Sequence, residues 1–322
     1  MRVAVLCGGR SHERAVSLRT GARVEQALVA LGHEPTLVDV DHDVEAELAT
    51  AGYDVAYIAL HGRGGEDDEP QSMCERIGLP YTGTRSGPCG AAFHKATAKR
   101  LMLAGGVPTP AFITFSEHAI EQFGAGDVRD ETADLGYPLV VKPARAGSSL
   151  GTRFVDDAAG LPRALISAMS YDSEVLVERH VTGRELSVAI IGSGDVDDLR
   201  VLPAVEIVPR HADWFDYESR YTHGETEFTC PPEGIDPHVL ELVKDVCEAA
   251  YQTLDISGCG RVDLLVDEDG QPWVLEVAPI PGLTETSLMT IACEAAGVSI
   301  EDLVASLLDD ALAQAQPVAD ED

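Results

Sequence analysis

Two short apolar runs near the carboxyl end of the chain flank an acidic turn, and each run carries one carboxylate. The runs cover 262–266 and 273–277, and this pattern predicts a β-hairpin. Side chains on one face of paired strands stand close together, so Asp263 and Glu276 could share a divalent cation beside Arg261. Such a site would suit a magnesium nucleotide. An ordinary hairpin with exposed acids explains the stretch equally well, so the choice depends on the rest of the chain.

The length and composition are those of a globular protein with a sizeable core. The chain has 322 residues, of which 45% are hydrophobic, enough for about two or three domains. No apolar run approaches the roughly 20 residues of a membrane span, and Met1 leads into a strand-like segment without a signal-peptide pattern. We therefore expect a cytoplasmic protein. Seven scattered cysteines without a C-x-x-C pair favour neither a disulfide framework nor a thiolate zinc site.

The charge of the chain narrows the choice of partners. A formal net charge of -32 at pH 7 argues against nucleic acid or an anionic membrane, because both repel a surface of that sign. It is also consistent with a high-salt cytosol. Of 23 basic residues only Lys95, Lys99, Lys142 and Lys244 are lysines. A lysine retained in an arginine-rich chain can present a compact charge to a phosphate, although drift in composition would also leave a few behind.

The first part of the chain alternates strand-like and helix-like segments. Strands are expected at 2–6, 35–40 and 55–60, and helices at 12–31 and near 44–51. This order predicts a parallel sheet with helices on both faces, whose ligands bind at the carboxyl ends of the strands. The glycine-containing loops 8–13 and 61–67 fall at such ends. A flexible acidic surface loop is the alternative explanation of 61–67.

Further along, an apolar strand ends at Lys142 and leads into a loop of small residues, 144–151. Backbone amides at Gly147, Ser148, Ser149 and Gly151 can donate to anionic oxygens while Lys142 supplies charge, as expected of a phosphate cover. It is not a Walker A loop. The remaining pattern predicts a strand and turn at 79–83 and strands at 111–115, 175–181, 185–191 and 202–208. It also predicts a substrate-side loop at 214–228, helices at 95–103, 237–254, 287–296 and 300–313, and a disordered tail at 317–322.

Taken in order, these motifs resemble those of the ATP-grasp fold and, within it, the D-alanine:D-alanine ligase family. The resemblance extends from Gly8 to about Leu307. The motifs that carry it are Gly8-Gly9-x-Ser11-x-Glu13-x-x-Val16-Ser17, His61-Gly62-x-Gly64-Gly65-Glu66-Asp67, Gly147-Ser148-Ser149-x-Gly151, Gly260-Arg261-x-Asp263, Pro281-Gly282-x-Thr284 and Ser287-Leu288. It implies an α/β and α+β architecture in three parts: an amino-terminal parallel α/β (pre-ATP-grasp) domain at 1–94, a central ATP-grasp subdomain at 95–182, and a carboxy-terminal ATP-grasp subdomain with metal and substrate residues at 183–322.

The resemblance also implies roles for individual residues. ATP would be held by Lys95, Lys142, Ser149, Glu178, Arg179, Val181, Glu185 and Arg220. Magnesium or manganese would be carried by Asp263 and Glu276. The amino acid substrates would be bound by Glu13, His61, Ser287 and Leu288. Catalysis would involve Glu13, Ser148 and Tyr221 as a relay, with Arg261 and the Gly282 amide stabilising the oxyanion.

The implied activity is the ATP-dependent ligation of two D-alanine molecules through an acyl phosphate. Its products would be D-alanyl-D-alanine, ADP and phosphate, as in the synthesis of peptidoglycan precursors. The implied partners are small amino acid substrates and a second copy of the chain in a homodimer. Both intermediates of this chemistry concentrate negative charge, so the site must supply cations and exclude water.

The sequence departs from the family pattern at the metal and substrate region. Ala278 stands where the family usually has an asparagine that binds the second magnesium, and Pro279 replaces a threonine. Arg220 replaces a lysine, and 68–70 differs from the usual run. Two alternatives follow: a ligase for a different amino acid pair, or a catalytically impaired nucleotide-binding homologue. Tyr221 favours an amine acceptor, because family members that make depsipeptides often have phenylalanine there.

Overall fold

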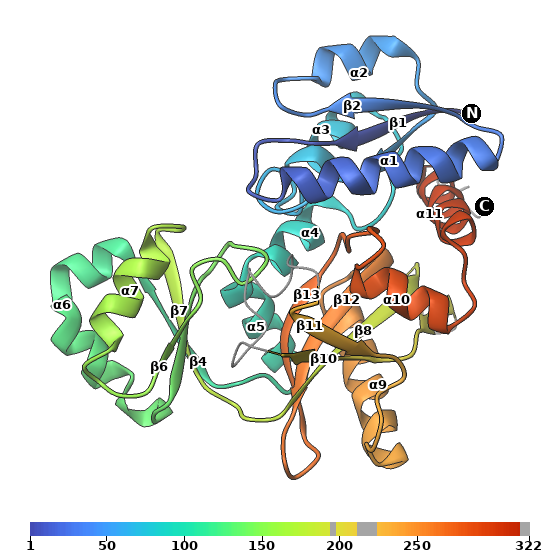
Figure 1. Ribbon diagram of the computed structural model, residues 1–322. Helices are drawn as coiled ribbons and strands as arrows, with labels where there is room; N and C mark the ends of the chain where they lie inside the picture. Colours follow the sequence, from blue (N-terminus) through green and yellow to red (C-terminus); the bar gives the residue numbers. More distant parts are fainter. Residues whose placement is uncertain (194–197, 211–223, 316–322) are drawn as a thin grey trace, which may run out of the picture.

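The computed structural model describes residues 1–193, 198–210 and 224–315, which form three sheets with helices packed against them. Figure 1 shows an amino-terminal lobe at the top, a small lobe at the lower left and a larger carboxy-terminal body at the lower right. Among the described residues, no helix is both long and apolar enough to cross a membrane.

The amino-terminal sheet is parallel and has the order β2-β1-β3. Its elements are β1 (Arg2–Cys7), α1 (Arg14–Ala30), β2 (Glu34–Asp39), α2 (Glu45–Ala51) and β3 (Val55–Ile58), followed by α3 (Glu69–Ile77) and α4 (Ser86–Phe93). Successive side chains of a strand point to opposite faces. Val3 and Val5 accordingly pack with Leu28 of α1, whereas Leu6 packs with Leu48 of α2 and Met73 of α3. The predicted parallel sheet with helices on both faces is confirmed.

The second sheet is antiparallel and has the order β4-β7-β5-β6. Its elements are β4 (Phe112–Ser116), α6 (Glu117–Glu131), the short 3-10 helix η1 (Ala133–Leu135), β5 (Leu139–Pro143), β6 (Arg153–Val155), α7 (Leu161–Met169) and β7 (Glu174–Arg179). A core that includes Val141, Leu165 and Val177 lies between the sheet and the two helices.

The largest sheet runs β11-β10-β8-β12-β13, with β9 paired to β8. Its strands are β8 (Arg184–Gly192), β9 (Arg200–Val201), β10 (Val205–Pro209), β11 (Thr226–Thr229), β12 (Gly258–Val266) and β13 (Pro272–Ala278). The associated helices are α5 (Lys95–Ala104), α9 (Pro237–Thr253), α10 (Leu288–Ala295) and α11 (Ile300–Ala315). The antiparallel pairing of β12 and β13 confirms the predicted hairpin.

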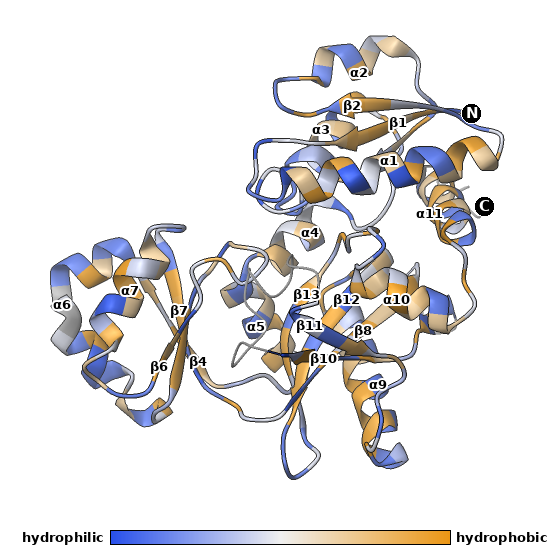
Figure 2. Cartoon of the chain, in the orientation of Figure 1, coloured by the Kyte–Doolittle hydropathy of each residue, from blue (hydrophilic) through white to orange (hydrophobic). Residues whose placement is uncertain are grey.

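Two helices connect parts of the chain that are distant in sequence. α11 returns to the amino-terminal lobe, where Leu307 shares a core with Val24 and Leu28 of α1. α5 packs on the carboxy-terminal body, because Met102 shares a core with residues of β8, β12 and α9. Figure 2 shows hydrophobic and hydrophilic residues mixed along the strands of the body and on the helices beside them. The predicted division at 94/95 and 182/183 stays a prediction.

Some local expectations are corrected. Residues 226–228, predicted as part of a loop, belong to strand β11. Residues 79–83, predicted as a strand and turn, form only an isolated bridge between Tyr81 and Ala56. Helices α3, α4, α6 and α7 were not predicted. Residues 214–223 of the predicted loop and the predicted tail lie outside the described residues.

Candidate functional site

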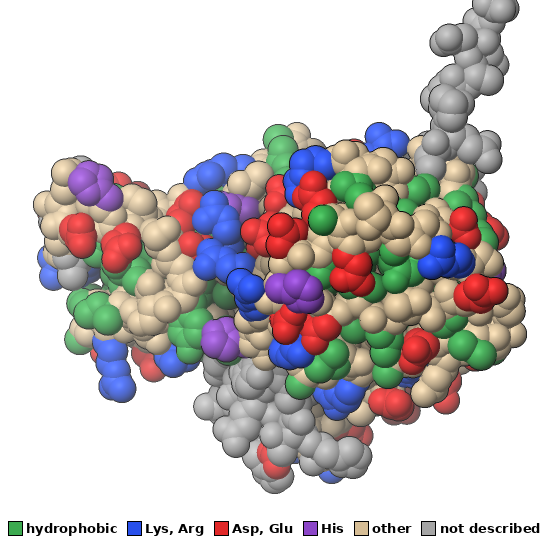
Figure 3. All heavy atoms as spheres, turned by 90° about the horizontal axis from the view of Figure 1, so that it is seen from above, with side chains coloured by type: hydrophobic (Ala, Val, Ile, Leu, Met, Phe, Trp, Pro, Cys, Tyr) green, Lys and Arg blue, Asp and Glu red, His purple; other side chains and the backbone are tan. Residues whose placement is uncertain are grey.

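A cavity of about 430 Å³ lies where the four-stranded sheet faces the large sheet. Its walls come from β5 and β7 on one side and from β8, β10, β12 and β13 on the other. The predicted ATP and metal residues that line it are Lys95, Lys142, Ser149, Glu178, Arg179, Val181, Glu185, Asp263 and Glu276. Figure 3, in which the amino-terminal lobe faces the viewer, shows basic side chains gathered in a band between the small lobe and the rest of the molecule, with acidic side chains on both sides of the band.

Glu178, at the end of β7, is buried between two lysines. Its Oε1 pairs with Lys142 Nζ, and its Oε2 lies 3.0 Å from Lys99 Nζ. Burial acts to raise the pKa of the Glu178 carboxyl, but the charges of Lys142 and Lys99 outweigh it and lower that pKa. The carboxylate is therefore ionised at neutral pH and can accept a hydrogen bond in the cavity.

Lys95, the first residue of α5, joins the phosphate-cover loop to the hairpin. Its Nζ donates to the Ala146 carbonyl at 2.6 Å and pairs with Glu276 Oε2 at 3.0 Å. The helix is held at the loop by a backbone bond from Lys95 N to the Ala144 carbonyl. One ammonium thus contacts both the loop expected to cover phosphate and a carboxylate expected to bind metal.

Asp263 and Glu276 stand directly opposite each other across β12 and β13, on one face of the hairpin. Arg261 Nε and Nη2 each donate to Asp263 at 2.8 Å, and Ser187 Oγ donates to the same carboxylate at 2.7 Å. Asp263 therefore fixes the direction of the Arg261 side chain. Both Asp263 oxygens have protein partners in this arrangement.

The residues at the hairpin fit a magnesium ion that keeps water and phosphate ligands. Mg²⁺ is often bound through only one or two carboxylates, and Asp263 and Glu276 provide two. No group of three or more His, Cys, Asp or Glu side chains suited to a metal occurs among the described residues. Ala278, which faces Arg261 across the hairpin, supplies no ligand atom. Of the residues that the structure describes, these two carboxylates would therefore be the protein's contribution to the metal site.

A smaller cavity, of about 120 Å³, adjoins the first. Glu276 lines both. The predicted substrate and catalytic residues that line the smaller cavity are Glu13, His61, Ser148, Arg261, Gly282, Ser287 and Leu288. α10 begins at Leu288, and amides at a helix N-terminus can receive a carboxylate. Ser287 is oriented by Thr284, whose amide donates to Ser287 Oγ at 3.0 Å.

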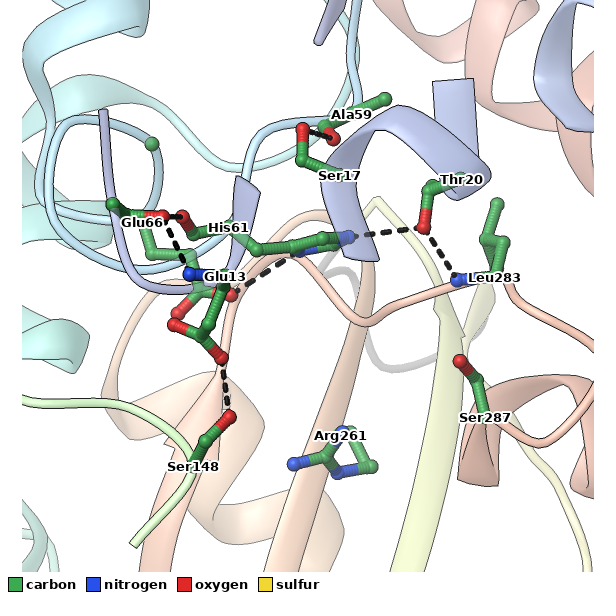
Figure 4. A network of polar contacts seen from close by, with 12 residues as sticks. Glu13, Ser17, Thr20, Ala59, His61, Glu66, Ser148, Arg261, Leu283 and Ser287 are labelled. Carbon is green, nitrogen blue, oxygen red and sulfur yellow. Dashed lines mark hydrogen bonds and ion pairs between the residues drawn. The ribbon is translucent and has the colours of Figure 1, made fainter. Parts of the chain in front are cut away.

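In Figure 4, Glu13 extends from the amino-terminal lobe toward Ser148 of the phosphate-cover loop. The Ser148 hydroxyl donates to Glu13 Oε1, which links segments 135 residues apart in sequence. Both residues are 9% exposed. Gly147 allows this approach, because a Cβ there would lie 2.7 Å from Glu13 Oε2. The loop therefore closes on a buried carboxylate.

The network in Figure 4 includes Glu66, a residue of the motif 61–67 for which no role was predicted. Its Oε1 lies 3.5 Å from His61 Nδ1, and His61 Nε2 lies 3.1 Å from Thr20 Oγ1. Burial raises the pKa of the Glu66 carboxyl despite the opposing effect of His61. The feature of the sequence that could have indicated a role for Glu66 is the pair of acidic residues, Glu66 and Asp67, in the glycine-containing loop 61–67. Of the other predicted residues, Arg220 and Tyr221 lie outside the described residues.

Comparisons with known proteins agree with this geometry. Residues 101–309 match the family model described as D-ala D-ala ligase C-terminus. A D-alanine–D-alanine ligase from Gloeobacter violaceus is 39% identical over 97% of this chain and 100% of its own length. One from Anaeromyxobacter dehalogenans is 40% identical, with 98% of each chain covered. The chain belongs to the D-alanine–D-alanine ligase family.

Solved structures of the family share the fold over nearly the whole chain. The D-alanine–D-alanine ligase from Bacillus anthracis superimposes with a TM-score of 0.84 at 32% identity, covering 98% of each chain. VanG D-Ala:D-Ser ligase from Enterococcus faecalis superimposes with a TM-score of 0.81 at 26% identity, covering 96% of this chain and 99% of that one. The three-part ATP-grasp architecture is therefore confirmed.

We expect Asp263→Asn to destabilise the metal-free protein, because Arg261 would lose its buried counter-charge. Breaking one partner of such a pair costs about 3 kcal/mol of the free energy of unfolding. Ser187→Ala, which removes one neutral donor to the same carboxylate, should cost only about 1 kcal/mol. Urea unfolding in the presence of a chelator measures both. Equal losses of unfolding free energy for the two substitutions would show that the Arg261–Asp263 ion pair does not stabilise the protein more than the Ser187 hydrogen bond does.

Proposed function

We propose that this protein joins two molecules of D-alanine at the expense of ATP, giving D-alanyl-D-alanine, ADP and phosphate. The observation that carries the proposal is that two adjoining cavities share Glu276. One is lined by lysines suited to a nucleotide, and the other by an acid, an arginine and a helix N-terminus suited to amino acids. Family membership supports the same activity. The protein would act in the cytoplasm, as a homodimer.

In the larger cavity, the chain's own residues would bind and orient ATP. Lys95 and Lys142 would move to the phosphates, and Glu178 would accept a hydrogen bond from the adenine amino group. Groups at Arg179 and Val181 would complete the adenine contacts, and the Glu185 carboxylate would accept hydrogen bonds from the ribose hydroxyls. Magnesium held by Asp263 and Glu276 would supply positive charge to the phosphates when bound.

In the smaller cavity, the residues would orient the two amino acids for successive reactions. The carboxylate of the first D-alanine attacks the terminal phosphorus and ADP leaves. The amine of the second then attacks the acyl carbon, phosphate departs and the amine loses a proton. Glu13 would receive the first ammonium group, Ser287 and the Leu288 amide the second carboxylate, and Arg261 with the Gly282 amide would stabilise the oxyanion.

A ligase for a different acceptor is the second candidate. The similarity to a D-Ala:D-Ser ligase and the replacement at Ala278 favour it. A nucleotide-binding homologue without ligase activity is the third, favoured by Ala278 alone. These candidates differ in what they do with ATP, so one assay separates them.

That assay measures phosphate release from ATP in the presence of Mg²⁺. It is run with D-alanine alone, with each of a panel of other D-amino acids, and with D-alanine together with D-serine as the acceptor. We expect release with D-alanine alone, together with the dipeptide in equal amount. Release only with a mixed pair would favour the second candidate. ATP binding without turnover would favour the third, and either result would overturn the main proposal.

Gly147→Ala tests the closure of the loop on Glu13. The added Cβ would displace the Glu13 carboxylate, so we expect kcat/KM for D-alanine to fall about tenfold or more, since small misplacements at reacting groups are costly. Gly87→Ala is the matched control, because a Cβ at Gly87 meets nothing within 4 Å. Steady-state kinetics of both variants provide the measurement. Unchanged kinetics in Gly147→Ala would show that the Glu13 position does not matter.

Ala278→Asn tests the two-carboxylate metal site. An added amide oxygen facing the smaller cavity should raise the affinity for divalent metal several-fold or leave it unchanged. Titration of Mn²⁺ followed by electron paramagnetic resonance, with ADP present, measures the affinity directly. If the variant folds but loses both metal binding and activity, then Ala278 has a role beyond the absence of a metal ligand at this position.

A further inference from the structure

Lys99 is a buried lysine that the proposed reaction does not use. It lies on α5, one turn after Lys95, and is 1% exposed. Its Nζ pairs with Glu178 Oε2 at 3.0 Å and donates to Thr109 Oγ1. A buried ammonium is costly unless it is paired and hydrogen-bonded, so a specific requirement must retain it.

The two lysines on Glu178 differ in their access to a ligand. Lys142 lines the larger cavity, and its side chain is 13% exposed. The described residues that line this cavity include Lys142 but not Lys99. Lys142 can therefore exchange Glu178 for a phosphate, whereas Lys99, which does not line the cavity, stays with Glu178 and Thr109. Without Lys99, that exchange would leave the buried carboxylate without a cation.

We propose that Lys99 is a positioning residue, the permanent counter-ion that keeps Glu178 charged and fixed at the nucleotide cavity while Lys142 moves to phosphate. This inference rests on the proposed function, because it requires that the cavity bind ATP. It adds a residue that acts through Glu178 and does not itself contact the nucleotide.

A second set of contacts anchors Lys99 to the metal-binding hairpin. Thr109 Oγ1 donates to the Val274 carbonyl at 2.7 Å, and Val274 N donates to the Pro108 carbonyl at 2.8 Å. Val274 lies two residues before Glu276 on β13. Lys99 thus connects Glu178 of the small lobe to the strand that carries Glu276, and holds the adenine and metal ends of the cavity at a fixed separation.

The electrostatics of these side chains agree with Lys99 as the permanent counter-ion of Glu178. Burial lowers the pKa of Lys99 to about 8, and repulsion from Lys142 and Lys95 acts in the same direction while Glu178 opposes it. Transfer of Lys142 and Lys95 to phosphate would remove that repulsion. The ion pair between Lys99 and Glu178 would therefore strengthen when the nucleotide binds.

The test is a double-mutant cycle on nucleotide affinity. Dissociation constants for ADP with Mg²⁺ and for a non-hydrolysable ATP analogue are measured by calorimetry in wild type, Lys99→Met, Glu178→Gln and the double variant. We expect Lys99→Met to weaken binding about tenfold or more, because Lys142 becomes the only counter-charge of Glu178. In the Glu178→Gln background, the same substitution should change affinity less than about twofold, since no carboxylate needs neutralising.

Lys244→Met, at an exposed lysine of α9, is the matched control and should bind like wild type. If Lys99 acted through packing alone, Lys99→Met would lower nucleotide affinity by the same factor with Glu178 and with Gln at position 178. That result would overturn the inference, as would wild-type affinity in Lys99→Met. If Lys99→Met unfolds, the double variant should regain a melting temperature above that of the single variant. A double variant no more stable than Lys99→Met would also overturn the inference. Failure of wild type to bind nucleotide would instead overturn the proposed function.

Discussion

Ion pairs between buried or half-buried groups expected to bind ligands are the interaction on which this site depends. Glu178 is held by Lys142 and Lys99, Glu276 by Lys95, and Asp263 by Arg261. Charges this far from water are tolerated only when each has a partner. The protein therefore balances the charges of the site internally, and ligand binding becomes an exchange of partners: lysines pass to phosphates and carboxylates to metal.

The fold makes this exchange possible by bringing the charges from separate elements. The hairpin of β12 and β13 supplies two acids in register, whereas β5 and β7 of the small lobe supply Lys142 and Glu178. α5 packs on the body yet reaches both sets, because Lys95 and Lys99 lie one turn apart on the same helix. The Lys142–Glu178 pair lies within the small lobe and the Arg261–Asp263 pair within β12, whereas the Lys99–Glu178 pair joins α5 of the body to the small lobe.

Much of this could be predicted from the sequence because the signals are local. The two apolar runs and the acidic turn between them predict the hairpin, and the scarcity of lysine drew attention to all four lysines, of which the family resemblance gave roles to Lys95 and Lys142. Pairing between distant residues could not be predicted: Lys99 and Glu178 are 79 residues apart, and only tertiary packing brings them together. Strand β11 was assigned to a loop because four residues with little apolar pattern form a strand only through their pairing with β10. Glu66 had no visible role until its burial beside His61 was known.

A crystal structure of the protein with ADP and Mg²⁺ tests the exchange of partners most directly. In that complex we expect Lys95 Nζ to leave Glu276 and Lys142 Nζ to leave Glu178, both for phosphate oxygens, with the metal on Asp263 and Glu276. Lys99 should keep its contact with Glu178. A complex in which nucleotide and metal are bound while Lys95 still pairs with Glu276 and Lys142 with Glu178 would contradict the proposed exchange of partners.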